Sequence, residues 1–410
     1  MPLSHLPGAS PLTRMADGTI KQVNPFTGTQ VWTVPGRGHR PLGSTRQNPA
    51  TVELPNDGRH CALCHLRYRE TPPEKARLVR HDDGNGNGGD GKGNGGNGKG
   101  NGGDGGGNGG DGNEQWLTLH NVPAERLFDQ VAELRRIPNL FEILSFDYWH
   151  ANYGHDMSPE AAEAMRSYLA TDSGREHVLA VVRARLAASG VPDDQWAAMG
   201  ENERLEPARA FFGGSHDLIV ARRHYLDDAT HDDDLASSGS LTPEEHALYI
   251  GFTVDAMAAT YAANRYARYV AVFQNWLKPA GASFDHLHKQ LVAIDERGVQ
   301  AELELRGLRL NPNLYNEAAV NYAAHHNLVI AENEHAIAFA GFGHRYPTLE
   351  VFSKSAEPLP WRQSPEEVRG MSDLLHACHA ATGAAVPCNE EWHHRPADVD
   401  VPMPWRIMVK

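Results

Sequence analysis

Two histidines and a glutamine alternate directly before an apolar run, and this pattern constrains the chain more than any other. His286, His288 and Gln290 precede the apolar residues 291–294. In an extended strand, side chains two residues apart point to the same side, so these three would share one face. A neutral imidazole attacks phosphorus well and leaves well, which suits a two-step nucleotidyl transfer. The small residues 281–283 would let a phosphate approach backbone N–H groups. An isolated pair of this kind is also compatible with two ordinary hydrogen-bonded histidines of a sheet.

The residues around this motif resemble those of the galactose-1-phosphate uridylyltransferases, a family of the histidine triad superfamily. Residues 272–275 read Val-Phe-Gln-Asn where the family has Val-Phe-Glu-Asn. The following residues keep the spacing of the family pattern Gly-x-Ser-x-x-His-Pro-His-Gly-Gln without a gap. The resemblance implies that His288 carries the nucleotidyl group and that Gln290 binds its phosphate. It also implies that Asn275 and Ser283 are neighbouring contacts to the phosphate and to the histidine.

Three positions in the motif depart from the family pattern. Asp285 and Leu287 stand where the family has proline, and Lys289 replaces a glycine. The spacing of the two imidazoles is kept, whereas the loop geometry and the specificity for a sugar phosphate are left open.

A predicted hairpin near the N-terminus also matches the family. Asn24-Pro and Thr27-Gly favour turns, and residues 31–34 suit a strand. Arg37 and Arg40 end this segment, and the resemblance places them near nucleotide phosphates, which planar guanidinium groups bind well. From the residues alone, both arginines could equally be solvated at the surface.

Cys61 and Cys64 form a Cys-x-x-Cys motif, which alone could be half of a zinc site, a redox pair or two ordinary thiols. Structural zinc takes four ligands, so two more must come from elsewhere. The resemblance implies that His224 and His286 complete a Cys2His2 site for Zn²⁺. Such a site would brace the nucleophile, which lies two residues after His286.

Residues 137–144 resemble the family strand that contributes to the nucleoside pocket. Asn139 could hydrogen-bond the edge of a base, and Phe141 could stack on it or pack beside it. Phe141 is also compatible with a place in the core.

The resemblance implies an α+β fold with two histidine-triad-like domains, in which helices pack on antiparallel sheets. We expect a catalytic domain at 15–300 and a second, degenerate domain at 301–410. The second domain is degenerate because its last predicted strand, 405–409, has no His-x-His pair. In the first domain, a helix is predicted from Pro243 to about Arg268, directly before the strand that leads to the motif.

Two segments of the first domain are predicted insertions. Residues 84–113 are nearly all Gly, Asn and Asp, which offer no apolar surface to offset the entropy of ordering, so we expect a disordered loop. Residues 158–210 contain an Ala-rich, charged, helical pattern that is longer than the family needs, and we expect a helical insertion there.

Composition excludes several classes of protein. A formal net charge of −14 argues against a nucleic-acid partner, which would require a basic face. There is no apolar run of membrane-spanning length, and the first residues lack the order of a signal peptide. The chain has only four cysteines, so a disulfide framework is not expected. We therefore expect a cytoplasmic enzyme. The resemblance adds an expected homodimer.

These observations lead to one functional hypothesis and two alternatives. The hypothesis is a transferase that moves UMP between a UDP-sugar and a hexose 1-phosphate through a nucleotidyl-histidine. One alternative is a dinucleotide phosphorylase or adenylyltransferase that uses the same histidine. The other is a zinc-stabilised nucleotide-binding protein without turnover.

Overall fold

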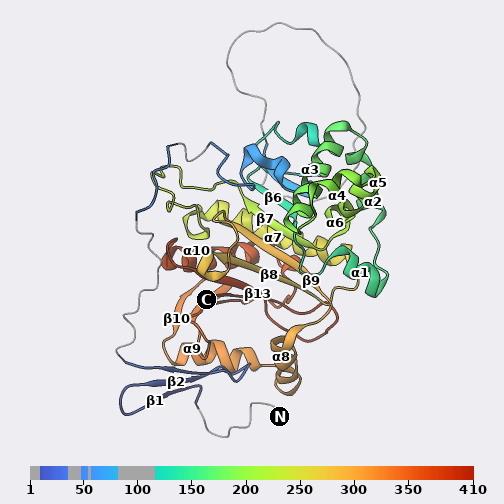
Figure 1. Cartoon of the computed structure of the whole chain (residues 1–410). Coiled ribbons are helices and arrows are strands. Elements are labelled where there is room, and N and C mark those ends of the chain that lie inside the picture. The colour runs from blue at the N-terminus through green and yellow to red at the C-terminus, as the bar shows by residue number, and fades with distance from the viewer. Residues whose placement is uncertain (1–9, 36–47, 54–56, 82–115) are drawn as a thin grey trace.

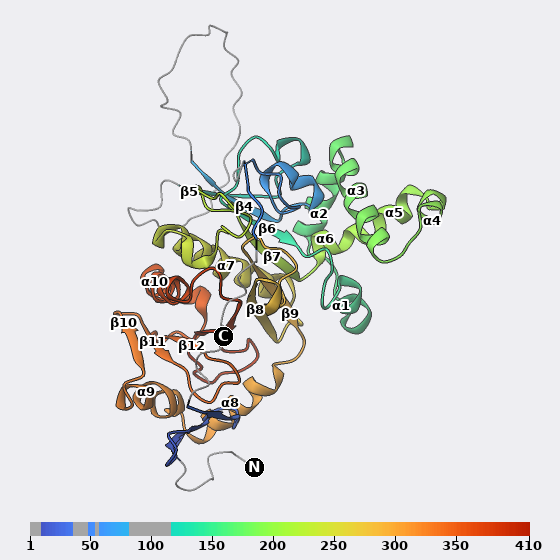
Figure 2. The same cartoon turned by 60° about the vertical axis from the view of Figure 1, so that its left-hand side comes forward.

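One antiparallel sheet of eleven strands forms the centre of the protein (Figures 1 and 2). The computed structural model describes residues 10–35, 48–53, 57–81 and 116–410. The strands of the sheet are β4 (Ala76–Arg80), β5 (Trp116–His120), β6 (Leu134–Pro138), β7 (His216–Ala221), β8 (Tyr269–Trp276), β9 (His288–Ile294), β10 (Val329–Glu332), β11 (Ala336–Ala340), β12 (Leu349–Ser353), β13 (Cys388–His393) and β14 (Arg406–Val409). Their order in space is β10-β11-β12-β14-β13-β8-β9-β7-β6-β4-β5, and each neighbouring pair is antiparallel.

Helices fill much of the remaining described chain. They are α1 (Phe146–Tyr153), α2 (Pro159–Leu169), α3 (Asp172–Ala188), α4 (Asp193–Ala198), α5 (Glu201–Leu205), α6 (Arg209–Gly213), α7 (Pro243–Ala263), α8 (Gly298–Leu310), α9 (Asn321–His325) and α10 (Pro365–Thr382). The predicted α+β class, with helices packed on antiparallel strands, is therefore confirmed.

Helices α7 and α10 cover one face of the sheet, and the same local chemistry begins both. In α7, the Thr242 side chain accepts a hydrogen bond from the Glu245 N–H, and the Glu245 carboxylate accepts one from the Thr242 N–H. Ser364 and Glu367 form the same capping box in α10. Such boxes satisfy N–H groups that the first turn leaves without partners. Helix α7 ends at Ala263, earlier than predicted.

The sheet consists of two consecutive halves that join at its middle. Helix α7 is followed by the hairpin β8–β9, and α10 is followed by β13–β14, so each half has a helix and then two strands. The halves meet where β8 pairs with β13, with Asn275 opposite Asn389. The predicted boundary between residues 300 and 301 falls inside α8, so the division into two domains at that point stays a prediction.

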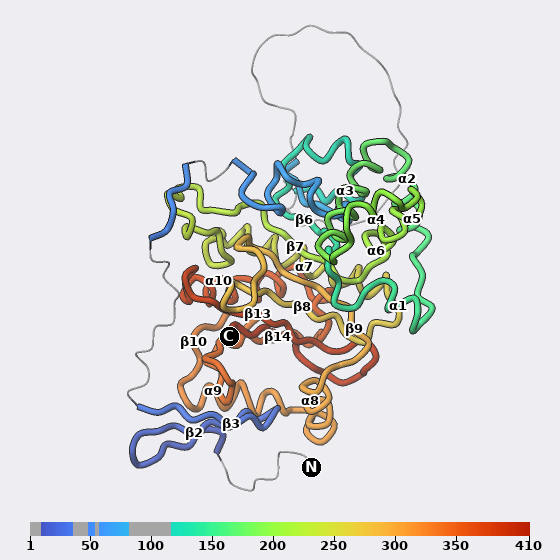
Figure 3. Tube along the Cα trace, in the orientation of Figure 1, coloured from blue at the N-terminus to red at the C-terminus, as the bar shows by residue number. Residues whose placement is uncertain are grey.

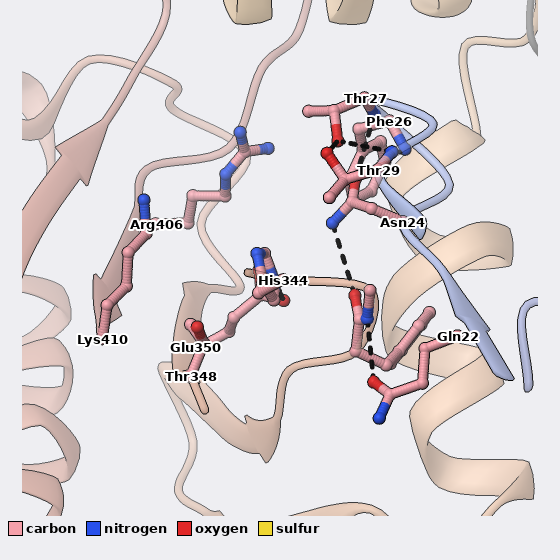
Figure 4. A network of polar contacts seen from close by, with 12 residues as sticks. Gln22, Asn24, Phe26, Thr27, Thr29, His344, Thr348, Glu350, Arg406 and Lys410 are labelled. Carbon is pink, nitrogen blue, oxygen red and sulfur yellow. Dashed lines mark hydrogen bonds and ion pairs between the residues drawn. The ribbon is translucent and has the colours of Figure 1, made fainter. Parts of the chain in front are cut away.

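The N-terminal segment packs against the second half. It forms a small sheet of β1 (Leu12–Arg14), β2 (Ile20–Val23) and β3 (Gln30–Thr33), and the predicted hairpin is present in it (Figure 3). The Gln22 side chain accepts a hydrogen bond from the Gly343 N–H at 3.0 Å, and Asn24 donates to the Phe342 carbonyl at 3.3 Å (Figure 4). Phe26 is buried with residues of α8 and of β11 and β12.

Helices α2–α6 cluster beside the first half, apart from α7 and α10 (Figure 2). They bury their own apolar group, which includes Val178, Val182 and Phe211. The helices predicted at 158–210 are therefore present and run from 159 to 213, whereas the assignment of this segment as an insertion stays a prediction. The loop predicted to be disordered at 84–113 lies outside the described residues. Among the described helices, none has the length and apolarity needed to cross a bilayer.

Candidate functional site

Four predicted metal ligands from separate parts of the chain meet in one cluster. Cys61 and Cys64 lie in a turn before a 3-10 helix (His65–Glu70), His224 follows β7, and His286 directly precedes β9. One ligand atom from each residue lies within 4.8 Å of the others. The strands β7 and β9 pair with each other, so the sheet itself brings the two histidines together.

The spacing of these atoms fits a tetrahedral ion. With Zn–S near 2.3 Å and Zn–N near 2.0–2.1 Å, a tetrahedron has edges of about 3.8 Å between sulfurs and about 3.5 Å between sulfur and nitrogen. The Cys61 and Cys64 sulfurs are 3.8 Å apart. Cys61 Sγ lies 3.4 Å from His286 Nδ1, and Cys64 Sγ lies 3.7 Å from the same atom and 3.6 Å from His224 Nδ1. A disulfide, with sulfurs about 2.05 Å apart, is not present.

Hydrogen bonds and charges around the cluster favour the protonation states that bind a cation. The His286 Nε2–H donates to the Ala221 carbonyl at 2.7 Å, which leaves the lone pair of Nδ1 facing the sulfurs. Such a bond fixes the tautomer of a metal-ligating histidine. The hydrogen bond with Cys61 lowers the pKa of Cys64, with further lowering by both histidines, and this favours the thiolate that metals bind.

His288 begins β9 and is only 5% exposed. Its Nδ1–H donates to the His286 carbonyl at 2.7 Å, because a carbonyl can only accept. The lone pair of the ring therefore resides on Nε2. Burial lowers the pKa of His288, so the neutral, nucleophilic ring is the favoured form. The Phe284 ring lies edge-on to it, with centroids 6.4 Å apart.

Gln290 is oriented by a histidine that the sequence analysis did not select. The His216 Nδ1 accepts a hydrogen bond from the Ile143 N–H at 3.1 Å, so its Nε2 carries the proton and donates to Gln290 Oε1 at 3.1 Å. Burial lowers the pKa of His216 to about 4, which keeps this ring neutral. Asn139 also lies at this point, with its Nδ2 at 3.4 Å from Gln290 Oε1. The one sequence signal for His216 is its position eight residues before the predicted ligand His224, at the start of β7.

The segment 137–144, which resembles a family strand of the nucleoside pocket, is an accessible loop after β6 ends at Pro138. Asn139 Oδ1 accepts from the Phe141 N–H at 2.9 Å, which shapes the turn after β6. Phe141 is 55% exposed and Ile143 is 61% exposed, so neither belongs to the core. The apolar side chains of Phe141 and Ile143 are therefore exposed in the loop that contains Asn139. Arg37 and Arg40, predicted near phosphates, lie outside the described residues.

Asn275 is held by the second half of the molecule. Asn389 donates from Nδ2 to Asn275 Oδ1 at 2.7 Å and to the Ala280 carbonyl at 2.8 Å. Asn275 Nδ2 lies 3.5 Å from the carbonyl of Gly281, whose φ of +92° favours glycine. Ser283 is exposed in the same turn. Asn389 was not predicted, because no local signal marks a strand that pairs from the other half.

Lys289 does not enter this site. Its side chain points to the opposite face of the sheet, as alternation along a strand requires. There its Nζ lies 2.6 Å from Glu390 Oε1, and both side chains are fully buried. The departure from the family's glycine therefore leaves the face of His288 and Gln290 unaltered.

The two helix–hairpin halves on one sheet give this chain the fold of two solved structures, a GalT-like protein and an ADP-glucose phosphorylase. An ADP-glucose phosphorylase from Arabidopsis thaliana, solved with bound ADP-glucose, is similar over 95% of this chain and 87% of its own, with a TM-score of 0.52 and 17% identity. A GalT-like protein from Arabidopsis thaliana is similar over 87% and 83%, with a TM-score of 0.50 and 16% identity. At these identities the likeness shows the fold alone.

By sequence, the chain belongs to the family described as a domain of unknown function, DUF4921, whose model matches residues 15–410. The search against curated proteins returns no match.

Proposed function

We propose that this protein is a nucleotidyltransferase that works through a nucleotidyl group on His288. The observation that carries the proposal is the tautomer of the His288 ring. Its Nδ1 proton is committed to the His286 carbonyl, and its Nε2 lone pair is therefore free for attack. His288 also lies two residues after His286 of the four-residue cluster. It lies two residues before Gln290, whose amide is oriented by His216.

The two steps follow from general chemistry. In the first, His288 Nε2 attacks the phosphorus that carries the nucleoside, the bond from phosphorus to the leaving phosphate breaks, and a phosphoramidate forms. In the second, an oxygen of the acceptor phosphate attacks the same phosphorus and the bond to Nε2 breaks. The ring is then neutral again, and no proton has been consumed.

Gln290 is suited to bind the transferred phosphate. Because its Oε1 accepts from His216, its Nε2–H₂ group is left to donate to a nonbridging oxygen. Donors placed in advance of the reaction stabilise developing charge at little cost in reorganisation. Asn275 and Ser283 stand on the strand and turn that precede β9, and we assign them to the same phosphate.

The four-residue cluster would hold Zn²⁺. Two thiolates and two imidazoles are a usual structural zinc set, and their spacing fits the ion. The ion would link the turn of Cys61 and Cys64 to the ends of β7 and β9. It would act as a brace for His288, with no part in the bond changes.

The finer assignment is transfer of UMP between a UDP-sugar and a hexose 1-phosphate. We also propose that the protein is a cytoplasmic homodimer and that Arg37 and Arg40 contact the phosphates. A second candidate is phosphorolysis, with inorganic phosphate as acceptor and an adenylyl group on His288. The similar fold of an ADP-glucose phosphorylase favours this candidate. The third candidate, binding without turnover, gains no support from the replacement of the family's glycine by Lys289, because that side chain points away from the site.

Covalent labelling tests the proposal and separates the candidates. The protein is incubated with UDP-glucose, ADP-glucose, UTP or ATP, each carrying ³²P in the phosphate next to the nucleoside. We expect an acid-labile, base-stable label that is absent from His288→Gly. The matched control is His231→Gly, which removes an exposed histidine from a loop and should keep the label. Absence of label from every donor, or its survival in His288→Gly, refutes the assignment.

A further inference from the structure

A cavity of about 280 Å³ lies between the helices α2, α6 and α7 and the adjoining ends of β4 and β6. Its floor includes Arg136 of β6, which pairs with Ile219 of β7, and Ile219 pairs in turn with Lys289 of β9. Residues that face each other across antiparallel strands point to the same side, so Arg136 shares the face of Lys289. The cavity therefore lies on the opposite face of the sheet from His288. Its volume is near the lower end of the range for small-molecule sites, about 300–1,000 Å³.

Two cations at the floor of the cavity share one carboxylate. Lys75 Nζ lies 2.6 Å from Asp217 Oδ1, and Arg136 Nε donates to Asp217 Oδ2 at 2.7 Å. The Asp217 side chain is buried, so the three groups together carry one excess positive charge where little water can reach. Burial lowers the pKa of Lys75, and the charge of Arg136 lowers it further. An excess charge in such surroundings favours a bound anion.

Both cations keep hydrogen-bond donors that the protein does not use. Arg136 Nη2 donates to Thr260 Oγ1 at 3.0 Å, and Arg136 Nη1 has no hydrogen bond within the described part of the chain. Lys75 Nζ carries three protons and donates two of them, to Asp217 and to the Gly214 carbonyl at 2.7 Å. The Lys75 side chain is 18% exposed and that of Arg136 is 11% exposed, so a ligand can reach these donors. Charged donors form strong hydrogen bonds with anionic oxygens.

Nearby carboxylates do not cancel this excess charge. Glu74 also lines the cavity, but it forms ion pairs with Arg77 and Arg135, so this second carboxylate is again shared by two cations. Glu160 is exposed to water at the start of α2. Glu142 lies outside the lining, and burial raises the pKa of its carboxyl to about 7, so at neutral pH this group is ionised only in part. The floor of the cavity therefore stays positive.

The helices α2 and α6 give the cavity an apolar wall. Ala161 and Ala164 are three residues apart, so they lie on one face of α2, and their small side chains leave space. Phe211 and Phe212 of α6 add larger apolar groups. Both helices lie within or directly after the predicted helical segment 158–210. A ligand that fits this cavity would therefore combine an anionic group with an apolar body.

We propose that this cavity binds a small organic anion, a carboxylate or phosphate monoester with an apolar body, at a site separate from the nucleotidyl-transfer site. The anionic oxygens bridge Lys75 and Arg136, and the apolar body lies against α2 and α6. Asp217 and His216 are consecutive in β7, so their side chains point to opposite faces. The ligand therefore contacts the strand that orients Gln290 but stays on the other face of the sheet.

Calorimetry with the full chain tests this site without requiring any reaction. The probes are benzoate and phenyl phosphate, with benzyl alcohol as a neutral probe of similar shape. We expect at least one anionic probe to bind, and benzyl alcohol to bind at least about tenfold more weakly because it offers no charge. The tighter of the two anions identifies the anionic group. Equal binding of the neutral probe, or no binding of either anion, overturns the assignment.

Lys75→Met removes the excess charge from the cavity. Arg136 and Asp217 then form a balanced pair, so the buried carboxylate keeps a partner, and the affinity for the anionic probes should fall at least about tenfold. Lys354→Met removes a partly exposed lysine outside the cavity, and this control should bind the probes as the wild type does. An unchanged affinity in Lys75→Met overturns the assignment.

A second pair of variants decides the case if Lys75→Met does not fold. Ala164→Leu fills space beside the apolar wall, and Ala162→Leu, on the same helix but outside the lining, is the matched control. Binding should weaken at least about tenfold in the first variant and stay unchanged in the second. The wild type saturated with UTP should bind the anionic probes as before, because the two sites lie on opposite faces. Equal affinities in the two alanine variants, or displacement of the probe by UTP, contradict the proposal.

Discussion

A buried ion pair on the opposite face of the sheet from His288, the proposed nucleophile, offers a stability test with a large expected effect. Glu390 Oε1 lies 2.6 Å from Lys289 Nζ, and Glu390 Oε2 lies 2.7 Å from His379 Nε2. Lys289 also donates to Gln274 at 3.1 Å, and Trp392 donates to Glu390. The Lys289 and Glu390 side chains have no exposed surface, so water cannot replace a lost partner.

Removal of Glu390 leaves the buried Lys289 with only neutral partners, and removal of Lys289 leaves the buried Glu390 with His379 as its one ionisable partner. Breaking a buried pair in this way costs about 3–5 kcal/mol. We expect that cost for Glu390→Gln and for Lys289→Met. In the double variant no uncompensated charge remains, so its loss should be smaller than the sum by about 1–3 kcal/mol.

The assay is denaturant unfolding of the four proteins, followed by tryptophan fluorescence and by circular dichroism. The matched control is the exposed pair of Lys354 and Glu332, whose side chains are 33% and 55% exposed. Lys354→Met or Glu332→Gln should each change the free energy of unfolding by about 1 kcal/mol or less. Losses as small as these for the buried pair, or strict additivity, would refute the reasoning.

The pH dependence of the same proteins gives a second readout. Burial alone would raise the pKa of Glu390, but Lys289 and His379 together lower it below its ordinary value of 4.5. The folded state therefore binds this proton less readily than the unfolded state. Stability from this group is fully present above about pH 4.5 and is lost as the pH falls, and Glu390→Gln should remove that part of the acid dependence. Labelling of His288 should persist in folded Lys289→Met, because Lys289 occupies the other face.

Three further predictions concern the site itself. The wild type should contain one equivalent of zinc by mass spectrometry of the native protein and Cys64→Ser should not, with a lower melting temperature, since zinc binding is coupled to folding; a full equivalent in the variant would exclude the assignment. His216→Phe removes the donor that orients Gln290, and kcat for labelling should fall roughly fivefold to tenfold with little change in donor KM, as expected for about 1 kcal/mol; an equal change in both would indicate a general structural defect. Asn389→Ala frees Asn275 and should lower the labelling rate by a similar factor, which Asn389→Asp should not restore because a carboxylate cannot donate to Asn275 Oδ1.

The sequence could predict those parts of the site that a short motif carries. The Cys-x-x-Cys spacing and the alternation of His286, His288 and Gln290 are local, and one family pattern connects them. The opposite orientation of Lys289 also follows from strand alternation. Its partner does not, because Glu390 lies 101 residues away in a strand whose register depends on the whole sheet.

Asn389 shows the same limit more clearly. It is 114 residues from Asn275, and only the pairing of β8 with β13 brings the two amides together. The predicted helix start at Pro243 was correct because capping residues are local signals, whereas the end of α7 came several residues early. Features set by a few neighbouring residues can therefore be predicted from this sequence, whereas contacts between its two halves depend on tertiary structure.

The two helix–hairpin halves differ at the position that corresponds to the proposed nucleophile. β14 follows β13 as β9 follows β8, but it carries Arg406, whose neighbour across the strands is His393. Arg406 is buried and paired with Glu304, which also accepts from Tyr315 at 2.6 Å. A guanidinium stays protonated and has no lone pair to offer phosphorus, so β14 cannot repeat the role of β9. The second half instead supplies Asn389, which donates to Asn275 on β8, the strand next to the proposed nucleophile of the first half.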